Sequence, residues 1–425
     1  MRKLLPQSAY ARNVITLMAG TGLAQAIPLA ISPILTRLYS PEEFGVFALY
    51  MAAVSILSVL ATGRYELAIV LPKSDRDAMH LVALSIMLAV IVSGLLLLVV
   101  CLFNASIARL LGAPEITRWL YWVPASTLLM GVYQSLNYWS NRKAQYRRLA
   151  VSRTVQSAST SLAQLLTGYA SAGPAGLIGG QLTGQALSSA VLAKLVYRED
   201  ETLINTIRKT RMFATAKKYI NFPKYMIPGQ LLNTASGQLP IILLNIFFGS
   251  AVVGFYSLTQ RVMAAPLSLV GGALGDVYRS ESAKQYALEK NCKDIFIKTI
   301  KKLILISIVF SIPFLLAGPE IFAFIFGEKW RAAGQMASML SVMMFFQNIS
   351  SPLSQTVLLA NKQALDLVWQ FVRFICAALS LYAGHKFFNS YYAAILIFSV
   401  SFSVLYIAHS IFQYRVAVGS EGNNE

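Results

Sequence analysis

The stretch REDETLINTIRKTRMFATAKKYINFPK, at residues 198–224, is the one long polar interval in an otherwise apolar chain. On each side of it, hydrophobic segments of about 20 or more residues alternate with short connectors. The stretch therefore divides the chain into two similar halves. We expect an N-terminal six-helix bundle at residues 1–197, a cytoplasmic linker at residues 198–218 and a C-terminal six-helix bundle at residues 219–425.

The composition is typical of a membrane protein. Of the 425 residues, 56% are hydrophobic and 13% are charged, and the mean hydropathy is +0.58. A helix of about 20 apolar residues crosses a hydrocarbon layer of roughly 30 Å with every backbone N–H and C=O satisfied internally. The formal charge of +18 does not indicate nucleic-acid binding, because the basic residues lie in short loops between apolar segments.

The fold class predicted from these segments is an all-α polytopic membrane protein with about 12 transmembrane helices. Six predicted spans precede the polar stretch, near residues 12–38, 44–70, 78–103, 117–140, 149–171 and 174–197. Six follow it, near residues 219–247, 251–275, 296–318, 332–358, 364–387 and 390–414. The second span is preceded by Ser40-Pro41-Glu42-Glu43, which is a helix-start signal.

The distribution of Lys and Arg predicts the orientation. If both termini are cytoplasmic, 27 of the 36 basic residues lie on the cytoplasmic side of the predicted spans. Cytoplasmic loops of membrane proteins carry an excess of Lys and Arg, so this split favours the arrangement with both ends inside. The remaining nine are six in the predicted outer connectors and three, Arg153, Arg261 and Arg373, that are counted within spans and assigned to neither side.

Sequence similarity relates the two halves. Gln25–Leu29 matches Gly237–Ile241, Gly45–Leu49 matches Gly254–Leu258, and Ser140–Ala144 matches Ala360–Ala364, with offsets of 212, 209 and 220 residues. Chance similarity among apolar segments explains one such match more easily than three in the same order. An even number of spans gives both halves the same orientation, and such parallel repeats enclose a central cavity. We therefore expect two pseudo-symmetric bundles around that cavity.

Cationic side chains inside the spans are candidates for substrate binding. Arg261 and Arg373 lie about ten residues into their spans, which is near the bilayer midplane at 1.5 Å per residue. Placing an Arg there costs roughly 2.5–3.5 kcal/mol, so it must face protein or water. We expect Arg261, Arg373 and Arg64 to attract an anionic group. The alternative is a structural Arg bonded to backbone carbonyls, and Arg153, nearer the cytoplasmic end of its span, is expected to reach toward the interface.

Two carboxylates are candidates for ion coupling. Glu66 and Asp276 fall within one residue of each other when the halves are aligned. Paired acids at equivalent positions can bind a coupling H⁺ or Na⁺. The alternative is a salt bridge with a neighbouring Arg, because Arg64 and Arg279 are close in the sequence.

Amide side chains at helical spacing predict a polar lining for the cavity. In the tenth span, Gln347, Ser351 and Gln355 follow this spacing. Such side chains can bind sugar hydroxyls, and they can equally form interhelical hydrogen bonds. The amides that we expect in the lining are Gln25, Asn137, Gln230, Asn233, Gln238 and Gln347.

The sequence predicts neither a catalytic site nor a metal site. The three cysteines lie far apart and form no CxxC pair, and the three histidines fall near predicted span ends. No predicted outer loop gathers the acids and bases that glycan chemistry needs. We expect a transporter rather than an enzyme, with no cofactor other than a coupling H⁺ or Na⁺.

Several motifs resemble those of Wzx-type O-antigen or oligosaccharide-repeat flippases, which are polysaccharide biosynthesis proteins. They are Arg64–Pro72 (RYELAIVLP) with Asp75 and Asp77, Phe222–Tyr225 (FPKY), and Phe248–Gly249 through Val253–Leu258. The resemblance covers essentially the whole chain and its plan of two halves. It implies membership of the multidrug/oligosaccharidyl-lipid/polysaccharide (MOP) exporter superfamily.

Proteins of that kind transfer undecaprenyl-pyrophosphate-linked glycans from the cytoplasmic to the periplasmic leaflet of the bacterial inner membrane. The resemblance therefore implies a role in assembling lipopolysaccharide O-antigen or another surface polysaccharide. It also implies a lipid-linked glycan substrate in the bilayer, with a polymerase and a chain-length regulator as possible partner proteins.

Two other functions remain open. A drug or metabolite antiporter of the same superfamily would share the fold, but related exporters usually carry an acid in the first span, and none lies between Arg12 and Arg37. A membrane glycan polymerase or ligase would be expected to have a large periplasmic loop with Arg and His, and the predicted loops are short. Flippases of lipid-linked peptidoglycan precursors generally have two more spans than this chain can supply.

Overall fold

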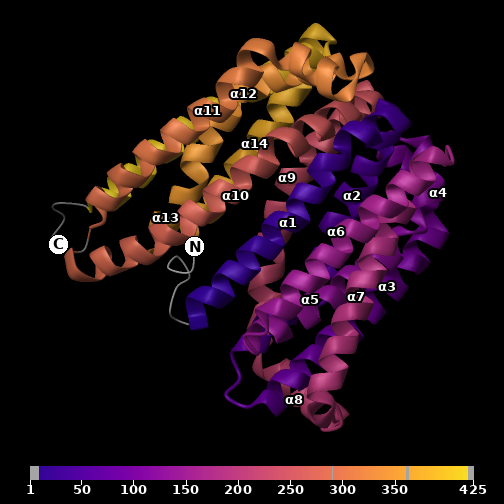
Figure 1. Ribbon diagram of the computed structural model, residues 1–425, viewed down its shortest axis with the longest axis vertical. Coiled ribbons are helices and arrows are strands. Elements are labelled where there is room, and N and C mark those ends of the chain that lie inside the picture. The colour runs from indigo at the N-terminus through magenta and orange to yellow at the C-terminus, as the bar shows by residue number, and fades with distance from the viewer. Residues whose placement is uncertain (1–8, 290, 360–362, 420–425) are drawn as a thin grey trace, which may run out of the picture. The chain divides into compact units, whose positions relative to one another are not determined.

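The computed structural model describes residues 9–289, 291–359 and 363–419. These residues form helices joined by short connectors, and none of them is in a strand (Figure 1). Two compact units are present, Met1–Gln238 and Leu239–Glu425. The predicted cytoplasmic linker at residues 198–218 contains the end of one helix and the whole of another, and the predicted domain boundaries stay predictions.

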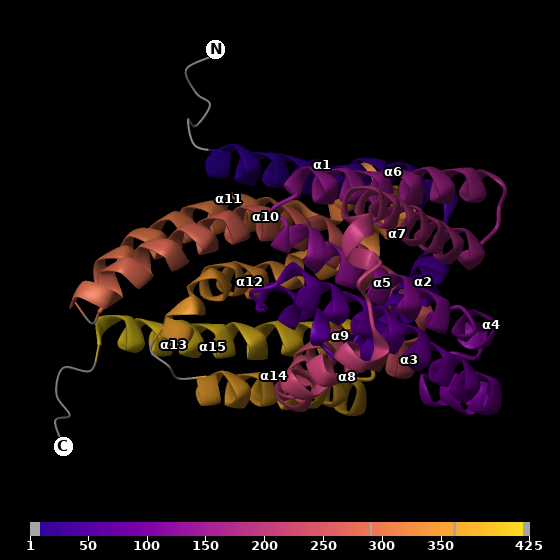
Figure 2. The ribbon, with the colours of Figure 1, turned by 90° about the horizontal axis from the view of Figure 1, so that it is seen from below.

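The first unit contains the helices from α1 into the first half of α9. Their bounds are α1 (Ala9–Leu38), α2 (Pro41–Ala61), η2 (Tyr65–Val70), α3 (Asp75–Leu110), η3 (Pro114–Ile116), α4 (Thr117–Leu120), α5 (Val123–Arg142), α6 (Tyr146–Tyr169), α7 (Pro174–Ile204), α8 (Lys209–Lys218), η4 (Phe222–Met226) and α9 (Ile227–Phe248). Figure 2 shows α1 and α6 side by side in this unit.

The second unit contains the rest of α9 and the helices that follow. Their bounds are α10 (Ser250–Glu289), α11 (Lys293–Phe326), η5 (Glu328–Trp330), α12 (Arg331–Leu353), α13 (Gln355–Leu359), α14 (Gln363–Phe388) and α15 (Tyr391–Val418). In this unit α12 packs against α10, α11 and α15, and α14 packs against α15. Of the third sequence match between the halves, Ala360–Lys362 lie outside the described residues.

The all-α polytopic fold class is confirmed. A helix overlaps each predicted span. Among the described residues, five helices are by themselves long and apolar enough to cross a membrane: Pro41–Ala61, Asp75–Leu110, Phe222–Phe248, Lys293–Phe326 and Tyr391–Val418. The chain therefore passes through the membrane several times, while the number of twelve spans stays a prediction.

The start of α2 follows the sequence signal closely. The Ser40 hydroxyl accepts a hydrogen bond from the Glu43 backbone N–H at 3.3 Å, and the Ser40 N–H donates to Glu43 Oε2 at 2.8 Å. This reciprocal pair is a capping box, with Pro41 at the first helical position. It satisfies two backbone donors that a helix start would otherwise leave without partners.

The end of α2 differs from the prediction. The second span was expected to continue to residue 70, but α2 ends at Ala61 and a 3-10 turn occupies Tyr65–Val70. Gly63 and Arg64 have φ values of 60° and 61°, in the left-handed region. Two such residues in succession stop a right-handed helix and turn the chain. The break moves Arg64 and Glu66 out of a continuous helix.

Small residues let α6 and α7 approach closely. A Cβ placed on Gly184 of α7 would lie 1.8 Å from Thr160 Oγ1, and one placed on Gly180 would lie 2.5 Å from Gln164 Cγ. These glycines are therefore packing positions, because any side chain would force the helices apart. The Gln164 amide also donates to the Leu177 carbonyl at 3.0 Å, which fixes the register of the pair.

A buried ionic cluster joins α5, α6 and α7. Arg148 donates to Asp200 Oδ2 at 3.1 Å and to Glu199, and the Trp139 indole N–H donates to Asp200 Oδ2 at 2.9 Å. Arg148 and Asp200 are each 5% exposed and Trp139 is fully buried. A buried charge without a partner is costly, so removing Asp200 would leave Arg148 only the half-exposed Glu199.

We expect Asp200→Ala to destabilise the protein by about 3–5 kcal/mol, the usual cost of breaking a buried ion pair. Glu199→Gln is the matched control, because Glu199 is half-exposed and its pair with Arg148 should contribute below about 1 kcal/mol. Thermal unfolding of both purified variants in the same detergent measures the difference. Equal melting temperatures for the two variants would show that the cluster contributes little to stability.

Candidate functional site

Polar cavities inside the two units contain several of the predicted site residues. In the first unit, a cavity of about 220 Å³ lies where α2 ends. We call it the Arg64 cavity. It is lined by Ser55, Ser58, Val59, Thr62, Arg64, Glu66, Met130, Gly131, Gln134, Tyr138, Gln230 and Thr234. Sequence reasoning named Arg64, Glu66 and Gln230 separately, and the structure brings them together.

An ion pair dominates the Arg64 cavity. Arg64 Nη1 lies 3.2 Å from Glu66 Oε1, and the Thr62 hydroxyl donates to Glu66 Oε2. Glu66 is only 3% exposed. The salt bridge that the sequence left as an alternative is therefore present, and the role of Glu66 in ion coupling stays a prediction. On the other side of the cavity, the Gln230 amide donates to the Thr234 hydroxyl at 3.2 Å.

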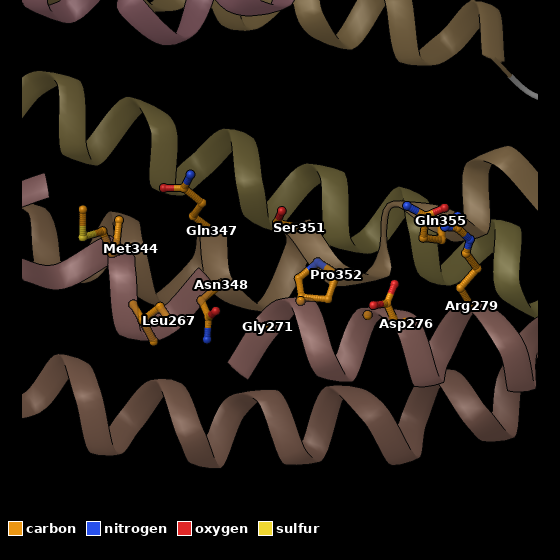
Figure 3. Close-up of a pocket in the computed structure, with 13 residues that line it drawn as sticks. Leu267, Gly271, Asp276, Arg279, Met344, Gln347, Asn348, Ser351, Pro352 and Gln355 are labelled. Carbon is orange, nitrogen blue, oxygen red and sulfur yellow. The ribbon is translucent and has the colours of Figure 1, made fainter. Parts of the chain in front are cut away.

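In the second unit, a cavity of about 370 Å³ lies between α10, α12 and α13 (Figure 3). We call it the Asp276 cavity. Its polar lining comes from Asp276, Arg279, Gln347, Asn348, Ser351 and Gln355. The predicted spacing of Gln347, Ser351 and Gln355 thus places them on one cavity. Asn348 was missed by the sequence analysis, because its neighbour Gln347 already fitted the helical pattern.

Asp276 is placed differently from Glu66, its expected counterpart in the first half. It was predicted at the end of a span, but α10 continues to Glu289, so Asp276 lies inside the helix. Asp276 and Arg279 are both exposed at the cavity and form no ion pair with each other in the described part of the chain. Figure 3 shows Arg279 and Gln355 at the end of the cavity where Asp276 lies. The carboxylate of Asp276 is therefore open to a ligand, whereas that of Glu66 is buried and paired.

The two arginines predicted near the midplane lie outside these cavities. Arg261 is a half-buried residue of α10, three positions before Ala264, which lines the Asp276 cavity. Arg373 on α14 donates to Gln370 Oε1 at 3.1 Å and is hydrogen-bonded to Tyr406 of α15. Their roles as substrate-binding cations stay predictions.

The remaining predicted amides are dispersed. Asn233 is exposed on α9 and Gln238 is half-buried on the same helix, and neither lines the cavities described above. Asn137 on α5 is half-buried one turn beyond Gln134, which does line the Arg64 cavity. The helical spacing identified these side chains as polar positions on their helices, but spacing alone does not say which positions meet across helices.

A further cavity of about 410 Å³ lies between α1, α6 and α7 in the first unit. We call it the Arg153 cavity. It is lined by Thr21, Ala24, Gln25, Pro28, Arg153, Gln156, Ser157, Thr160 and Gln181. Arg153 donates to Thr21 Oγ1 at 2.6 Å. Its side chain thus turns toward α1 and shares the cavity with Gln25, and its expected reach toward the membrane interface stays a prediction.

None of the described residues forms a cluster of three or more His, Cys, Asp or Glu that could hold a metal ion. His409 of α15 stacks on Trp369 with ring centroids 4.0 Å apart, and its Nδ1 lies 2.9 Å from the Ser350 hydroxyl. These contacts hold α12, α14 and α15 together. His409 is thus accounted for as a packed, hydrogen-bonded side chain of the second unit.

Residues 34–335 match the family described as "Polysaccharide biosynthesis protein". Teichuronic acid biosynthesis protein TuaB of Bacillus subtilis (strain 168) is 22% identical over 168 residues, 40% of this chain and 35% of that protein. Succinoglycan biosynthesis transport protein ExoT of Rhizobium meliloti (strain 1021) is 24% identical over 319 residues, 73% of this chain and 61% of that protein. The chain thus spans less than two thirds of the length of either relative.

Solved structures share the fold across nearly the whole chain. The "Lipid II flippase MurJ, inward closed conformation" superposes with a TM-score of 0.74 at 11% identity, over 94% of this chain and 86% of that one. The "inward-facing conformation of a multidrug resistance MATE family transporter of the MOP superfamily" gives 0.68 at 14% identity, over 94% and 93%. These superpositions confirm the MOP fold that the sequence motifs implied.

The Arg64–Glu66 pair allows a test by double-mutant cycle. We expect Arg64→Gln, Glu66→Gln and the double variant to reveal a coupling of about 1–3 kcal/mol, because the partners are close and mostly buried. The matched control is the exposed pair Arg331–Glu328, with Nε and Oε1 2.6 Å apart. Its coupling should be smaller and should fall as salt is added. Unfolding in detergent at two salt concentrations measures both cycles, and additive effects at Arg64 and Glu66 would contradict the expectation.

Proposed function

This chain belongs to the polysaccharide biosynthesis protein family, and from that premise we propose that it flips lipid-linked oligosaccharides across the bacterial inner membrane. The proposed cargo is an undecaprenyl-pyrophosphate-linked repeat unit, moved from the cytoplasmic to the periplasmic leaflet. The two curated relatives are named for teichuronic acid and for succinoglycan. The proposal therefore names a class of cargo for surface polysaccharide assembly, of which O-antigen is one case.

The observation that carries the proposal is the presence of guanidinium and amide groups in cavities within membrane-embedded helical units. A pyrophosphate with attached sugars cannot cross hydrocarbon unaided, since charged and polar groups lose their hydration there. Its polyprenyl tail is apolar and can stay in the lipid. Arginine suits the phosphate because its planar fork of donors matches phosphate oxygens, and amides and carboxylates suit sugar hydroxyls.

Movement of such a cargo requires alternating access. We propose that two rigid bodies corresponding to the two compact units open the path to one leaflet and then to the other. Arg64, Arg261 and Arg373 are the cations proposed to contact the pyrophosphate or acidic sugars. Glu66 and Asp276 are the proposed carriers of a coupling H⁺ or Na⁺, with both chain termini in the cytoplasm. A polymerase and a chain-length regulator are the proposed partner proteins.

The multidrug antiporter is the second candidate, because a transporter of that kind has the same fold. Its weakness is chemical: the sequence contains no Asp or Glu before Glu42, so the first helix offers no carboxylate for a cationic drug or a coupling ion. The cavity of the first unit that faces α1 instead carries Arg153. A cation in that position disfavours cationic drugs by charge repulsion.

Depletion of the protein tests the proposed function directly. In depleted cells, labelled polyprenyl-linked repeat units are probed from the periplasmic side with an impermeant glycan-modifying reagent. We expect completed units to accumulate where the reagent cannot reach them. Single units that accumulate on the periplasmic side would mean that translocation is intact, and a polymerase or ligase function would then replace the flippase.

Arg261→Ala is expected to reduce export by about tenfold or more, because loss of a charge-assisted hydrogen bond to phosphate is worth roughly 1.5–3 kcal/mol. Arg118→Ala, at an exposed position of the short helix α4, is the matched control. Export is measured as repeat units modified at the periplasmic face, at equal protein level. Unchanged export in the Arg261 variant would remove its assigned role.

Neutral substitution of the two acids tests ion coupling. We expect Asp276→Asn to abolish the dependence of export on the proton or sodium gradient, because its carboxylate is exposed at the Asp276 cavity. Glu66→Gln is the comparison variant, because the carboxylate of Glu66 is already paired with the guanidinium of Arg64. Export is measured in inverted vesicles with and without each gradient. Gradient dependence that survives in both variants would exclude both residues as coupling groups.

A further inference from the structure

The Arg153 cavity is formed mainly by the facing sides of α1 and α6, which are largely polar. On α6, Arg153, Gln156, Ser157 and Thr160 recur at the spacing of one helical face, and on α1 the positions are Thr21, Ala24, Gln25 and Pro28. Gln181 of α7 completes the lining. Of these residues only Ala24 and Pro28 have apolar side chains. The cavity of about 410 Å³ therefore presents one guanidinium surrounded by amides and hydroxyls.

The local backbone of α1 explains why the cavity is built this way. Pro28 has no N–H, so the carbonyl of Ala24 loses its partner within the helix. The Ser157 hydroxyl of α6 donates to that carbonyl at 2.6 Å. This bond pins α6 to α1 at the level of the cavity. It places Arg153, one turn earlier on α6, opposite Thr21, one turn earlier on α1.

Neither α1 nor α6 carries a carboxylate beside Arg153, and α7 carries carboxylates only near its C-terminal end. The sequence contains no Asp or Glu from Met1 to Pro41, and none from Ile116 to Arg198. Those two ranges include all of α1, all of α6 and the part of α7 that precedes its polar end. The described lining holds no acid either. The positive charge in the cavity is therefore not balanced by the helices that form it.

The other cavities differ in this respect. In the Arg64 cavity the guanidinium pairs with Glu66 at 3.2 Å, and in the Asp276 cavity Arg279 shares the lining with a carboxylate. A cation that is removed from bulk water and has no anionic partner is costly. It gains the most from an anion that arrives as a ligand, because attraction between charges is stronger where the effective dielectric is low.

We propose that the Arg153 cavity is a binding subsite for a phosphate ester carried beside hydroxyl groups. Arg153 holds the phosphate oxygens, with the Thr21 hydroxyl as a second donor. Gln25, Gln156, Gln181 and Thr160 bond to the neighbouring hydroxyls, because amides both donate and accept. The inference rests on the proposed function, within which the subsite holds the pyrophosphate and the first sugar of the lipid-linked unit. A phospholipid headgroup with a hydroxylated substituent offers the same chemistry.

The test uses the full chain, purified and placed in phosphatidylcholine nanodiscs, with radiolabelled geranyl pyrophosphate as the probe. We expect Arg153→Gln to weaken probe binding by at least about tenfold, the effect of losing a charge-assisted hydrogen bond. Arg153→Lys should bind the probe more tightly than Arg153→Gln and more weakly than the wild type, since it keeps the charge and loses the planar fork of donors. Arg147→Gln is the matched control, because Arg147 is an exposed cation of the same helix.

A second measurement locates the probe and guards against misfolding of the Arg153 variants. Gln25→Cys is introduced in the otherwise native chain, and its modification by a water-soluble maleimide is followed with and without geranyl pyrophosphate. We expect the probe to slow modification of Cys at this position by several-fold, and to leave the labelling of the parent chain unchanged. Equal probe binding in wild type and Arg153→Gln, an equal loss in Arg147→Gln, or no protection at position 25 would each overturn the subsite.

Two further arms identify the natural source of the phosphate. If a phospholipid headgroup occupies the subsite, nanodiscs that contain phosphatidylglycerol should weaken probe binding to the wild type and leave binding to Arg153→Gln unchanged. If the lipid-linked glycan occupies it, phosphatidylglycerol should have no effect. The depletion experiment distinguishes the two proposals. If repeat units accumulate on the cytoplasmic side in depleted cells and probe binding does not depend on Arg153, the subsite is rejected and the flippase function is kept. If export is normal in depleted cells, the flippase function itself is rejected.

Discussion

The hydrocarbon interior offers no hydrogen-bond partners, and the architecture of this protein follows from that constraint. Helices satisfy their own backbone, so apolar stretches become long helices such as α3 and α11. Wherever a helix is interrupted, a neighbour must supply a polar group. Pro28 leaves the Ala24 carbonyl without an intrahelical donor, and the Ser157 hydroxyl takes that place at 2.6 Å. Polar residues are thus concentrated where helices break, and the cavities form at the same places.

The same constraint explains how the helices hold their arginines. Arg148 is buried against Asp200 and Glu199, and Arg64 against Glu66, so each of these charges is paired inside the protein. Arg373 is bonded to the neutral side chains of Gln370 and Tyr406. Arg153 faces a hydroxyl and amides in a cavity. A carboxylate partner offsets part of the positive charge of its arginine, whereas an arginine without a carboxylate keeps its full capacity to attract an anion.

Hydropathy and charge were enough to predict the helical segments, because the apolar length needed to cross a bilayer leaves a strong signal in the sequence. The break after Ala61 was not predictable in that way, since residues 44–70 read as one continuous apolar run with a few polar interruptions. Arg64 and Glu66 are two positions apart and would not face each other on a helix. Their ion pair at 3.2 Å depends on the left-handed turn at Gly63 and Arg64, which periodicity does not encode.

The cavities of the two related halves differ in the charged groups that they expose. The 220-residue offset that relates Ser140–Ala144 to Ala360–Ala364 also relates Arg153 to Arg373. Each half therefore has an arginine within one of its helices, Arg153 on α6 and Arg373 on α14. In the first half, the guanidinium lines a cavity whose lining contains no acid. In the second half, Gln370 and Tyr406 bond the guanidinium, and the carboxylate of Asp276 is instead exposed at a cavity between α10 and α12. The two arginines thus have different surroundings, which sequence similarity alone does not reveal, because it aligns residues without their partners.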